Sequence, residues 1–205
     1  MRWMKGPSHI RKRAECWVLS PPMWSHCWLP DRFEASDSLL YLFDANVLIT
    51  ASNTYYPIDQ IPEYWEWLQF QGSSGNIKLP LEIMEEILAG KKNDDPLLAW
   101  IKDAVNKRAL LLDEIVDPAL VNAVVESGYA ADLTDDEIEE VGRDPFLIAY
   151  GLAENHRCVV TTEVSAPSKK RQNRRIPDVC ADFGLECCTP FKVNRELGFR
   201  TGWKV

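Results

Sequence analysis

The sequence predicts an α/β fold in which helices cover both faces of a mostly parallel central sheet, a three-layer α/β/α arrangement. Short, continuous apolar runs such as 39–43 are typical of strands that are buried on both faces. These runs alternate with segments such as 83–88, in which apolar residues recur at helical spacing. Strands that alternate with helices indicate crossover connections, and therefore a parallel sheet.

Proline, glycine and aspartate mark the ends of the predicted elements in the first half of the chain. Proline is tolerated in the first turn of a helix, and glycine is common just after its last residue. The elements in chain order are a strand at 39–43, a helix from Pro62 to the glycine- and serine-rich segment 72–75, a strand at 77–80, a helix through 83–88 that stops at Gly90, and a helix from Asp95 through Val105.

The second half continues the alternation of helices and strands. Segment 109–116 fits either a strand or a helix. Thr134 and Glu137 have the spacing of a capping box, in which each side chain bonds a backbone N–H of the first turn. The remaining elements are helices that start at Asp117-Pro118, at Thr134 and at Asp144-Pro145, and strands at 158–162 and 185–188.

Composition restricts the class of protein. The 205 residues are 46% hydrophobic and 26% charged, which suits one globular domain with an extension. No run approaches the roughly 18 apolar residues of a membrane helix, and the first thirty residues lack the apolar core of a signal peptide. We therefore expect a cytoplasmic protein with no membrane partner, whose six cysteines are reduced thiols.

The first 37 residues differ from the rest of the chain. They show neither helical nor strand periodicity and contain four of the eight tryptophans. Residues 1–37 are predicted to form an irregular N-terminal arm, although a translation start placed too far upstream would look the same. The folded domain is expected to span 38–205.

Charge is distributed unevenly along the chain. The net charge of −8 argues against broad, non-specific DNA binding. Residues 110–142 contain ten acids and no Lys or Arg, whereas the fifty residues from His156 onward contain ten Lys and Arg against five acids. The C-terminal part is therefore able to attract phosphate.

Four widely separated carboxylates are predicted to meet at one edge of the sheet. Asp44 and Glu163 directly follow two of the predicted strands. Glu86 lies on the helix after another strand, and Asp144 begins the helix that precedes the strand ending at Glu163. Ligands of open parallel sheets collect at the carboxyl ends of the strands. Because such a cluster needs compensating cations, and Mg²⁺ or Mn²⁺ prefers oxygen ligands, we expect a site for one or two of these ions.

At these positions the sequence resembles PIN-domain ribonucleases. The resemblance covers about 39–197, and each motif is short, but four of them occur in the right order. An additional segment, IPDVC (176–180), resembles an uncharacterised bacterial branch of PIN-like proteins. The four motifs are LFDANVLI (42–49), EILAG (86–90), DPFLIA (144–149) and VTTE (160–163).

The resemblance implies a PIN-like fold and a metal-dependent ribonuclease that hydrolyses RNA to leave a 5′-phosphate and a 3′-hydroxyl. Many bacterial members are VapC-type toxins of type II toxin–antitoxin pairs, so it also implies a cognate antitoxin and a homodimer. The implied catalytic residues and metal ligands are Asp44, Glu86, Asp144 and Glu163, and the residues that would hold those carboxylates by hydrogen bonds are Asn46 and Thr161.

Glu163 stands where the family usually has Asp, which leaves two questions open. Asp178 is the alternative fourth acid. The alternative function is a PIN-like scaffold that has lost catalysis and binds protein or RNA. Glu163 favours that alternative, and the presence of all four acids argues against it.

A basic segment follows Glu163 within a few residues. We expect this loop to grip the RNA backbone, which would make activity strongly dependent on salt concentration. A plain surface loop is the simpler interpretation. The basic residues are Lys169, Lys170, Arg171, Arg174 and Arg175.

Overall fold

A four-stranded parallel sheet forms the centre of the part of the chain that the computed structural model describes, residues 39–90 and 95–204. The predicted arm at 1–37 lies outside the described residues. The elements in chain order are β1 (Leu40–Phe43), α1 (Ala45–Thr50), the π-helical segment η1 (Ala51–Tyr55), α2 (Pro62–Ser73), β2 (Ile77–Lys78), α3 (Leu81–Leu88), α4 (Pro96–Lys102), α5 (Ala104–Leu110), α6 (Pro118–Ala123), the π-helical segment η2 (Val124–Tyr129), α7 (Asp135–Val141), α8 (Asp144–Ala153), β3 (Arg157–Val160), the 3₁₀ turn η3 (Arg171–Asn173), α9 (Ile176–Asp182), β4 (Glu186–Cys188) and α10 (Pro190–Glu196).

The strand order is β2-β1-β3-β4, and all three pairings are parallel. This confirms the predicted α/β class and the parallel sheet. The central strands β1 and β3 pair over their whole length, from Leu40 opposite Arg157 to Phe43 opposite Val160. Because both strands end at the same level, the residues that follow them, Asp44 and Thr161, lie side by side at the carboxyl edge of the sheet.

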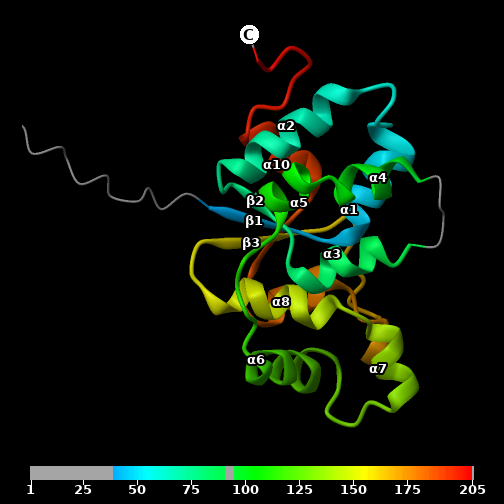
Figure 1. Cartoon of the computed structure of the whole chain (residues 1–205). Coiled ribbons are helices and arrows are strands. Elements are labelled where there is room, and N and C mark those ends of the chain that lie inside the picture. The colour runs from blue at the N-terminus through cyan, green and yellow to red at the C-terminus, as the bar shows by residue number, and fades with distance from the viewer. Residues whose placement is uncertain (1–38, 91–94, 205) are drawn as a thin grey trace, which may run out of the picture. The chain divides into compact units, whose positions relative to one another are not determined.

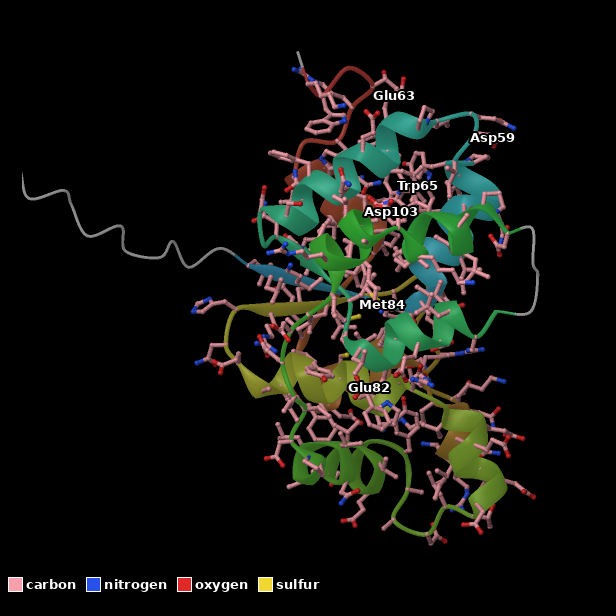
Figure 2. The ribbon with its side chains drawn as sticks, in the orientation of Figure 1. Asp59, Glu63, Trp65, Glu82, Met84 and Asp103 are labelled. Atoms are coloured by element: carbon pink, nitrogen blue, oxygen red, sulfur yellow. The ribbon has the colours of Figure 1, made fainter. Side chains whose placement is uncertain are left out.

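Helices cover both faces of this sheet (Figure 1). Helices α2, α5 and α10 lie on one side, and α6 and α8 lie on the other. The side chains of Leu42 and Phe43 in β1 are completely buried between these layers. Trp65 of α2 is also buried, among the helices of its layer (Figure 2), and its ring meets Trp100 of α4 edge to face with 4.9 Å between ring centroids. None of the helices in the described residues is both long and apolar enough to cross a membrane.

All four predicted strands form, but the single helix expected from Asp95 through Val105 is wrong. The chain breaks at Asp103, whose backbone is extended (φ −58°, ψ 131°), and forms α4 and α5 instead. The Asp103 carboxylate accepts hydrogen bonds from the backbone N–H groups of Val105 and Asn106, so it caps α5. Segment 109–116 is helical only to Leu110, after which Leu111 forms an isolated parallel bridge with Leu79, the residue that follows β2.

Replacing Gly72 by Ala is expected to destabilise the fold by about 1–3 kcal/mol. A Cβ at this position in α2 would lie 2.9 Å from the backbone oxygen of Ala109 and 2.8 Å from Leu110 Cδ2, so α2 and α5 would have to separate. Urea unfolding measures the loss. The control is Ser73→Ala, an exposed position of the same helix, which should change stability by less than about 0.5 kcal/mol. Equal stability of Gly72→Ala and wild type would contradict the packing described here.

Candidate active site

Residues from helices α1, α3 and α8 and from the segment after β3 help to form an acidic cleft at the carboxyl edge of the sheet. The cleft has a volume of about 530 Å³, and Asn46, Glu86, Asp144 and Glu163 are among the residues that line it. Asp44 is 2% exposed, and its charge acts on both Glu86 and Asp144. The structure thus brings the four predicted acids together.

Asp44 is held by the chain around it. Thr161 Oγ1 donates a hydrogen bond of 2.9 Å to Asp44 Oδ2, and the same hydroxyl accepts one of 3.1 Å from the Glu163 N–H. Burial raises the pKa of Asp44, while the bonds from Thr161 and from the backbone N–H groups of Asn46 and Ala45 lower it. Thr161 therefore orients Asp44 and ties it to the segment that carries Glu163.

Asp144 is the most perturbed acid of the cleft. It is the first residue of α8, and its carboxyl has no hydrogen-bond partner among the described residues. Burial raises the pKa of Asp144 to about 8, with further contributions from the charges of Asp44, Glu163 and Glu86. Arg175 opposes this rise. A carboxyl with no bonding partner beside three others binds a proton or a cation readily.

Glu86 reaches the cleft from α3. Figure 2 shows Met84 on the side of α3 toward the sheet and Glu82 on the side toward α8. Because residues four apart share a face of a helix, Glu86 also lies on the α8 side, near Asp144. Glu86 is exposed overall, but desolvation of its carboxyl and the charge of Asp44 raise its pKa, which Arg143 opposes.

Glu163 lines the cleft, but its carboxylate is bonded to residues other than the acids. Its carboxylate accepts a hydrogen bond of 2.7 Å from Arg175 Nη1 and one of 2.9 Å from the backbone N–H of Ile176, at the start of α9. In residues 39–90 and 95–204, no group of three or more His, Cys, Asp or Glu side chains is arranged to hold a metal ion. The donor set, oxygen atoms of crowded carboxyls, nevertheless has the chemistry that Mg²⁺ and Mn²⁺ prefer.

A family model described as Domain of unknown function (DUF4411) matches residues 41–201. The chain belongs to the DUF4411 family. The match includes all four acids of the cleft and leaves the predicted N-terminal arm outside. No curated protein and no solved structure matches this chain.

Most basic side chains in the loop of this DUF4411 protein form ion pairs with acidic side chains of the same chain. Arg171 contacts Asp132 and Glu137 through bonds of 2.7 Å. Arg174 pairs with Asp182 at 2.6 Å, and Arg175 with Glu163. Among the described residues, only Lys169 and Lys170 of the five predicted RNA-binding side chains lack an ion pair, and both are exposed.

Asp178, the alternative fourth acid, lies outside the acidic cleft. Its carboxylate accepts a hydrogen bond of 2.5 Å from Ser165 Oγ and one of 2.7 Å from the Ala166 N–H. These bonds fix the loop that follows Glu163 onto α9. The geometry therefore places Glu163, and not Asp178, with Asp44, Glu86 and Asp144.

Arg143 is a residue of the cleft that the sequence did not reveal. Its guanidinium donates to the Glu85 carboxylate at 2.9 Å and to the Glu82 backbone oxygen at 2.7 Å, so it joins α3 to the start of α8. The sequence feature that could have predicted Arg143 is its position directly before Asp144, because a charged neighbour of a site acid lies near that site.

Proposed function

We propose that this DUF4411 protein is a metal-dependent endoribonuclease of PIN-like fold that hydrolyses RNA phosphodiester bonds. The observation that supports it best is the convergence of Asp44, Glu86, Asp144 and Glu163 on one cleft at the carboxyl ends of β1 and β3. The order and identity of these acids resemble the motifs of PIN-domain ribonucleases. That resemblance extends the proposal to a cytoplasmic toxin of a type II pair, with a cognate antitoxin and a homodimer.

In this proposal the cleft holds one or two Mg²⁺ or Mn²⁺ ions. Asp44, Asp144 and Glu86 would hold the ion, and Glu163, whose carboxylate is now bonded to Arg175 and Ile176, would be the fourth acid available to it. Such an ion supplies an activated water nucleophile and stabilises negative charge on the phosphate.

The chain's own side chains would orient these groups and the RNA. Thr161 keeps the Asp44 carboxylate in one orientation through its bond to Oδ2. Arg143 and Arg175 line the cleft, where they offer positive charge to an RNA phosphate. Lys169 and Lys170 provide the further exposed cations.

A specific observation favours the alternative, an inactive scaffold that binds protein or RNA. Glu163 already has a cation and a backbone N–H as partners, so it does not need a metal ion to be satisfied. The half-buried carboxyl of Asp144 argues against this alternative, because the charges of three neighbouring acids raise its pKa and a scaffold gains nothing from that crowding.

The test is cleavage of total RNA by purified protein with Mg²⁺, with Mn²⁺ and with EDTA. We expect cleavage with either ion and none with EDTA, together with Mn²⁺ binding in calorimetry. Folded protein that neither cuts RNA nor binds Mn²⁺ would support the scaffold. Adding the antitoxin, once it is identified, should suppress cleavage.

Replacing Arg175 by Gln is expected to tighten Mn²⁺ binding by roughly three- to tenfold. The substitution removes a cation from the cleft and frees Oε1 of Glu163, while the Ile176 N–H keeps its bond to Oε2. One charge–charge contact near a protein surface contributes on the order of 1 kcal/mol, which corresponds to a factor of about five. Calorimetric titration measures the change, and Arg108→Gln, at an exposed position on α5, is the matched control. Weaker Mn²⁺ binding in Arg175→Gln would show that Glu163 is not a ligand.

A further inference from the structure

Two cysteine side chains are in contact between the neighbouring strands β3 and β4. The Cys158 thiol donates a hydrogen bond to Cys188 Sγ, with 3.4 Å between the two sulfur atoms. The strands are parallel, and Cys188 lies opposite Val160, two residues after Cys158. Because residues two apart in a strand point to the same face of a sheet, both thiols lie on one face. Neither of them lines the acidic cleft.

The two thiols differ in exposure and in acidity. Cys158 is completely buried, whereas Cys188 is half-buried on β4, at one end of the strand order. The hydrogen bond from Cys158 lowers the pKa of Cys188, and the Lys192 ammonium adds to this, against burial and the charges of Glu196 and Glu186. The same hydrogen bond, together with burial, raises the pKa of Cys158. Because the thiolate is the reactive form of cysteine, Cys188 is the thiol that reacts first with an oxidant.

The thiol pair is connected to the acidic cleft through Thr161. The Thr161 N–H donates a hydrogen bond of 3.1 Å to the Cys188 backbone oxygen, and the Thr161 hydroxyl orients Asp44. A disulfide bond is about 2.05 Å long, so sulfur atoms that are now 3.4 Å apart would have to approach by roughly 1.4 Å. Any part of this movement that the Cys188 backbone takes up changes the hydrogen bond that holds Thr161.

We propose that Cys158 and Cys188 form a redox pair that a peroxide oxidises to a disulfide bond, and that this bond weakens metal binding in the acidic cleft. The Cys188 thiolate attacks one oxygen of hydrogen peroxide, which gives a sulfenic acid at Cys188 and releases hydroxide. The Cys158 sulfur then attacks the Cys188 sulfur, and the sulfenic hydroxyl leaves with the Cys158 proton as water. The two sulfurs lose two electrons, which the peroxide gains. Disulfides of cytosolic proteins are usually of this transient, redox-sensing kind.

Peptide mapping after treatment with hydrogen peroxide tests the disulfide. Trypsin separates Cys158, in peptide 158–169, from Cys188, in peptide 176–192. We expect peroxide to link these two peptides in wild type and dithiothreitol to release them. Cys188→Ser should abolish the link, whereas the matched control Cys187→Ser, which changes the adjacent and also half-buried cysteine of β4, should keep it. In Cys158→Ala, dimedone should label a sulfenic acid at Cys188, because the second thiol is missing.

Two results would overturn the redox pair. One is folded wild type in which peptides 158–169 and 176–192 stay unlinked after peroxide treatment, including the case of a disulfide confined to 176–192. The other is a link that persists in Cys188→Ser, because a different cysteine would then be the partner of Cys158. Neither result bears on the proposed ribonuclease function.

Titration of reduced and oxidised wild type with Mn²⁺, after removal of the peroxide, tests the effect on the cleft. This part of the inference rests on the proposed metal site. We expect the oxidised protein to bind Mn²⁺ up to about tenfold more weakly, the lower end of the usual effect of losing a group that orients a ligand. Peroxide-treated Cys188→Ser should bind Mn²⁺ like the reduced protein. Equal affinity of the two wild-type forms would overturn the effect on the cleft. A mapped disulfide in protein that binds no Mn²⁺ in either form would keep the redox pair and overturn the metal site.

Discussion

Replacing Asp144 by Asn is expected to abolish RNA cleavage and, in metal-free buffer, to make the protein more stable. The variant keeps the shape of the side chain and removes the charge that Asp44, Glu163 and Glu86 oppose. Most substitutions destabilise a protein. A gain in stability would therefore show that the surroundings of Asp144 are arranged to bind a metal ion and not to stabilise the fold.

The gain in stability should depend on pH in a defined direction. The pKa of Asp144 is about 8 in the folded protein, against an ordinary value of 3.8 for this side chain, so between these values the folded protein holds a proton that the unfolded chain has lost. Wild-type stability then falls as pH rises through this window, by at most about 1.4 kcal/mol per pH unit. The amide of Asp144→Asn does not titrate, so the advantage of the variant should grow from pH 5 to pH 8 and reach about 2–4 kcal/mol.

Urea unfolding of both proteins in EDTA, at pH 5, 6, 7 and 8, measures this difference. Asp113→Asn is the matched control, since Asp113 is exposed and has no bonded partner among the described residues. Mn²⁺ should raise the melting temperature of wild type more than that of Asp144→Asn, because binding to the folded state stabilises it. A variant less stable than wild type at pH 8 would show that Asp144 has a stabilising partner and would remove the main support for the metal site.

The sequence could predict the sheet and the four acids because both depend on short segments. A buried parallel strand is recognisable from a few apolar residues, and the residue after it must lie at the carboxyl edge of the sheet. Asp44 follows from that rule alone, and Glu163 lies two residues beyond Thr161, the residue that follows β3. The break at Asp103 was harder to predict, because the apolar spacing of α4 continues into α5 and only the capping carboxylate marks the end.

The pairing of the basic loop could not be predicted in the same way. Arg171 bonds Asp132 and Glu137, which lie more than thirty residues earlier in the acid-rich segment. The sequence shows a basic and an acidic stretch but does not show that folding brings them together. The capping-box residue Glu137 is one of these partners, so a residue predicted to cap a helix also neutralises the loop. RNA contact is therefore assigned mainly to Lys169 and Lys170.

The contact that helix α9 makes with a site residue was also not predicted from the sequence. Its segment, 176–180, resembles PIN-like proteins but was not predicted as a helix. In the structure its first backbone N–H, that of Ile176, holds Glu163. The sequence therefore identified the acid but not the bonds that its carboxylate makes to Arg175 and Ile176.

Replacing Asp44 by Asn is expected to lower the rate of RNA cleavage by on the order of 10³-fold, because metal coordination contributes several kcal/mol of charge stabilisation to such reactions. Thr161→Val should lower it by roughly 10- to 100-fold, the usual effect of removing a group that orients a ligand. The effect is smaller because Thr161→Val removes the 2.9 Å hydrogen bond to Asp44 and the acceptor of the Glu163 N–H, while the Asp44 carboxylate itself remains. Initial rates on a labelled single-stranded RNA, at saturating Mn²⁺, measure both.

Comparison of Asp44→Asn with Thr161→Val distinguishes a ribonuclease site from a contaminating nuclease or a structural role of Asp44 better than Asp44→Asn alone. Asp113→Asn makes the same chemical change at an exposed position and should cut like wild type. A contaminating nuclease would give equal rates for all four proteins. A purely structural role of Asp44 would lower activity and melting temperature together, whereas a ligand role lowers activity and Mn²⁺ affinity in folded protein. Burial raises the pKa of the Asp44 carboxyl, and the amide of Asn still offers one oxygen to the Thr161 hydroxyl, so the variant is expected to stay folded in metal-free buffer. Loss of cleavage with the fold intact is therefore the result that assigns Asp44 to the metal.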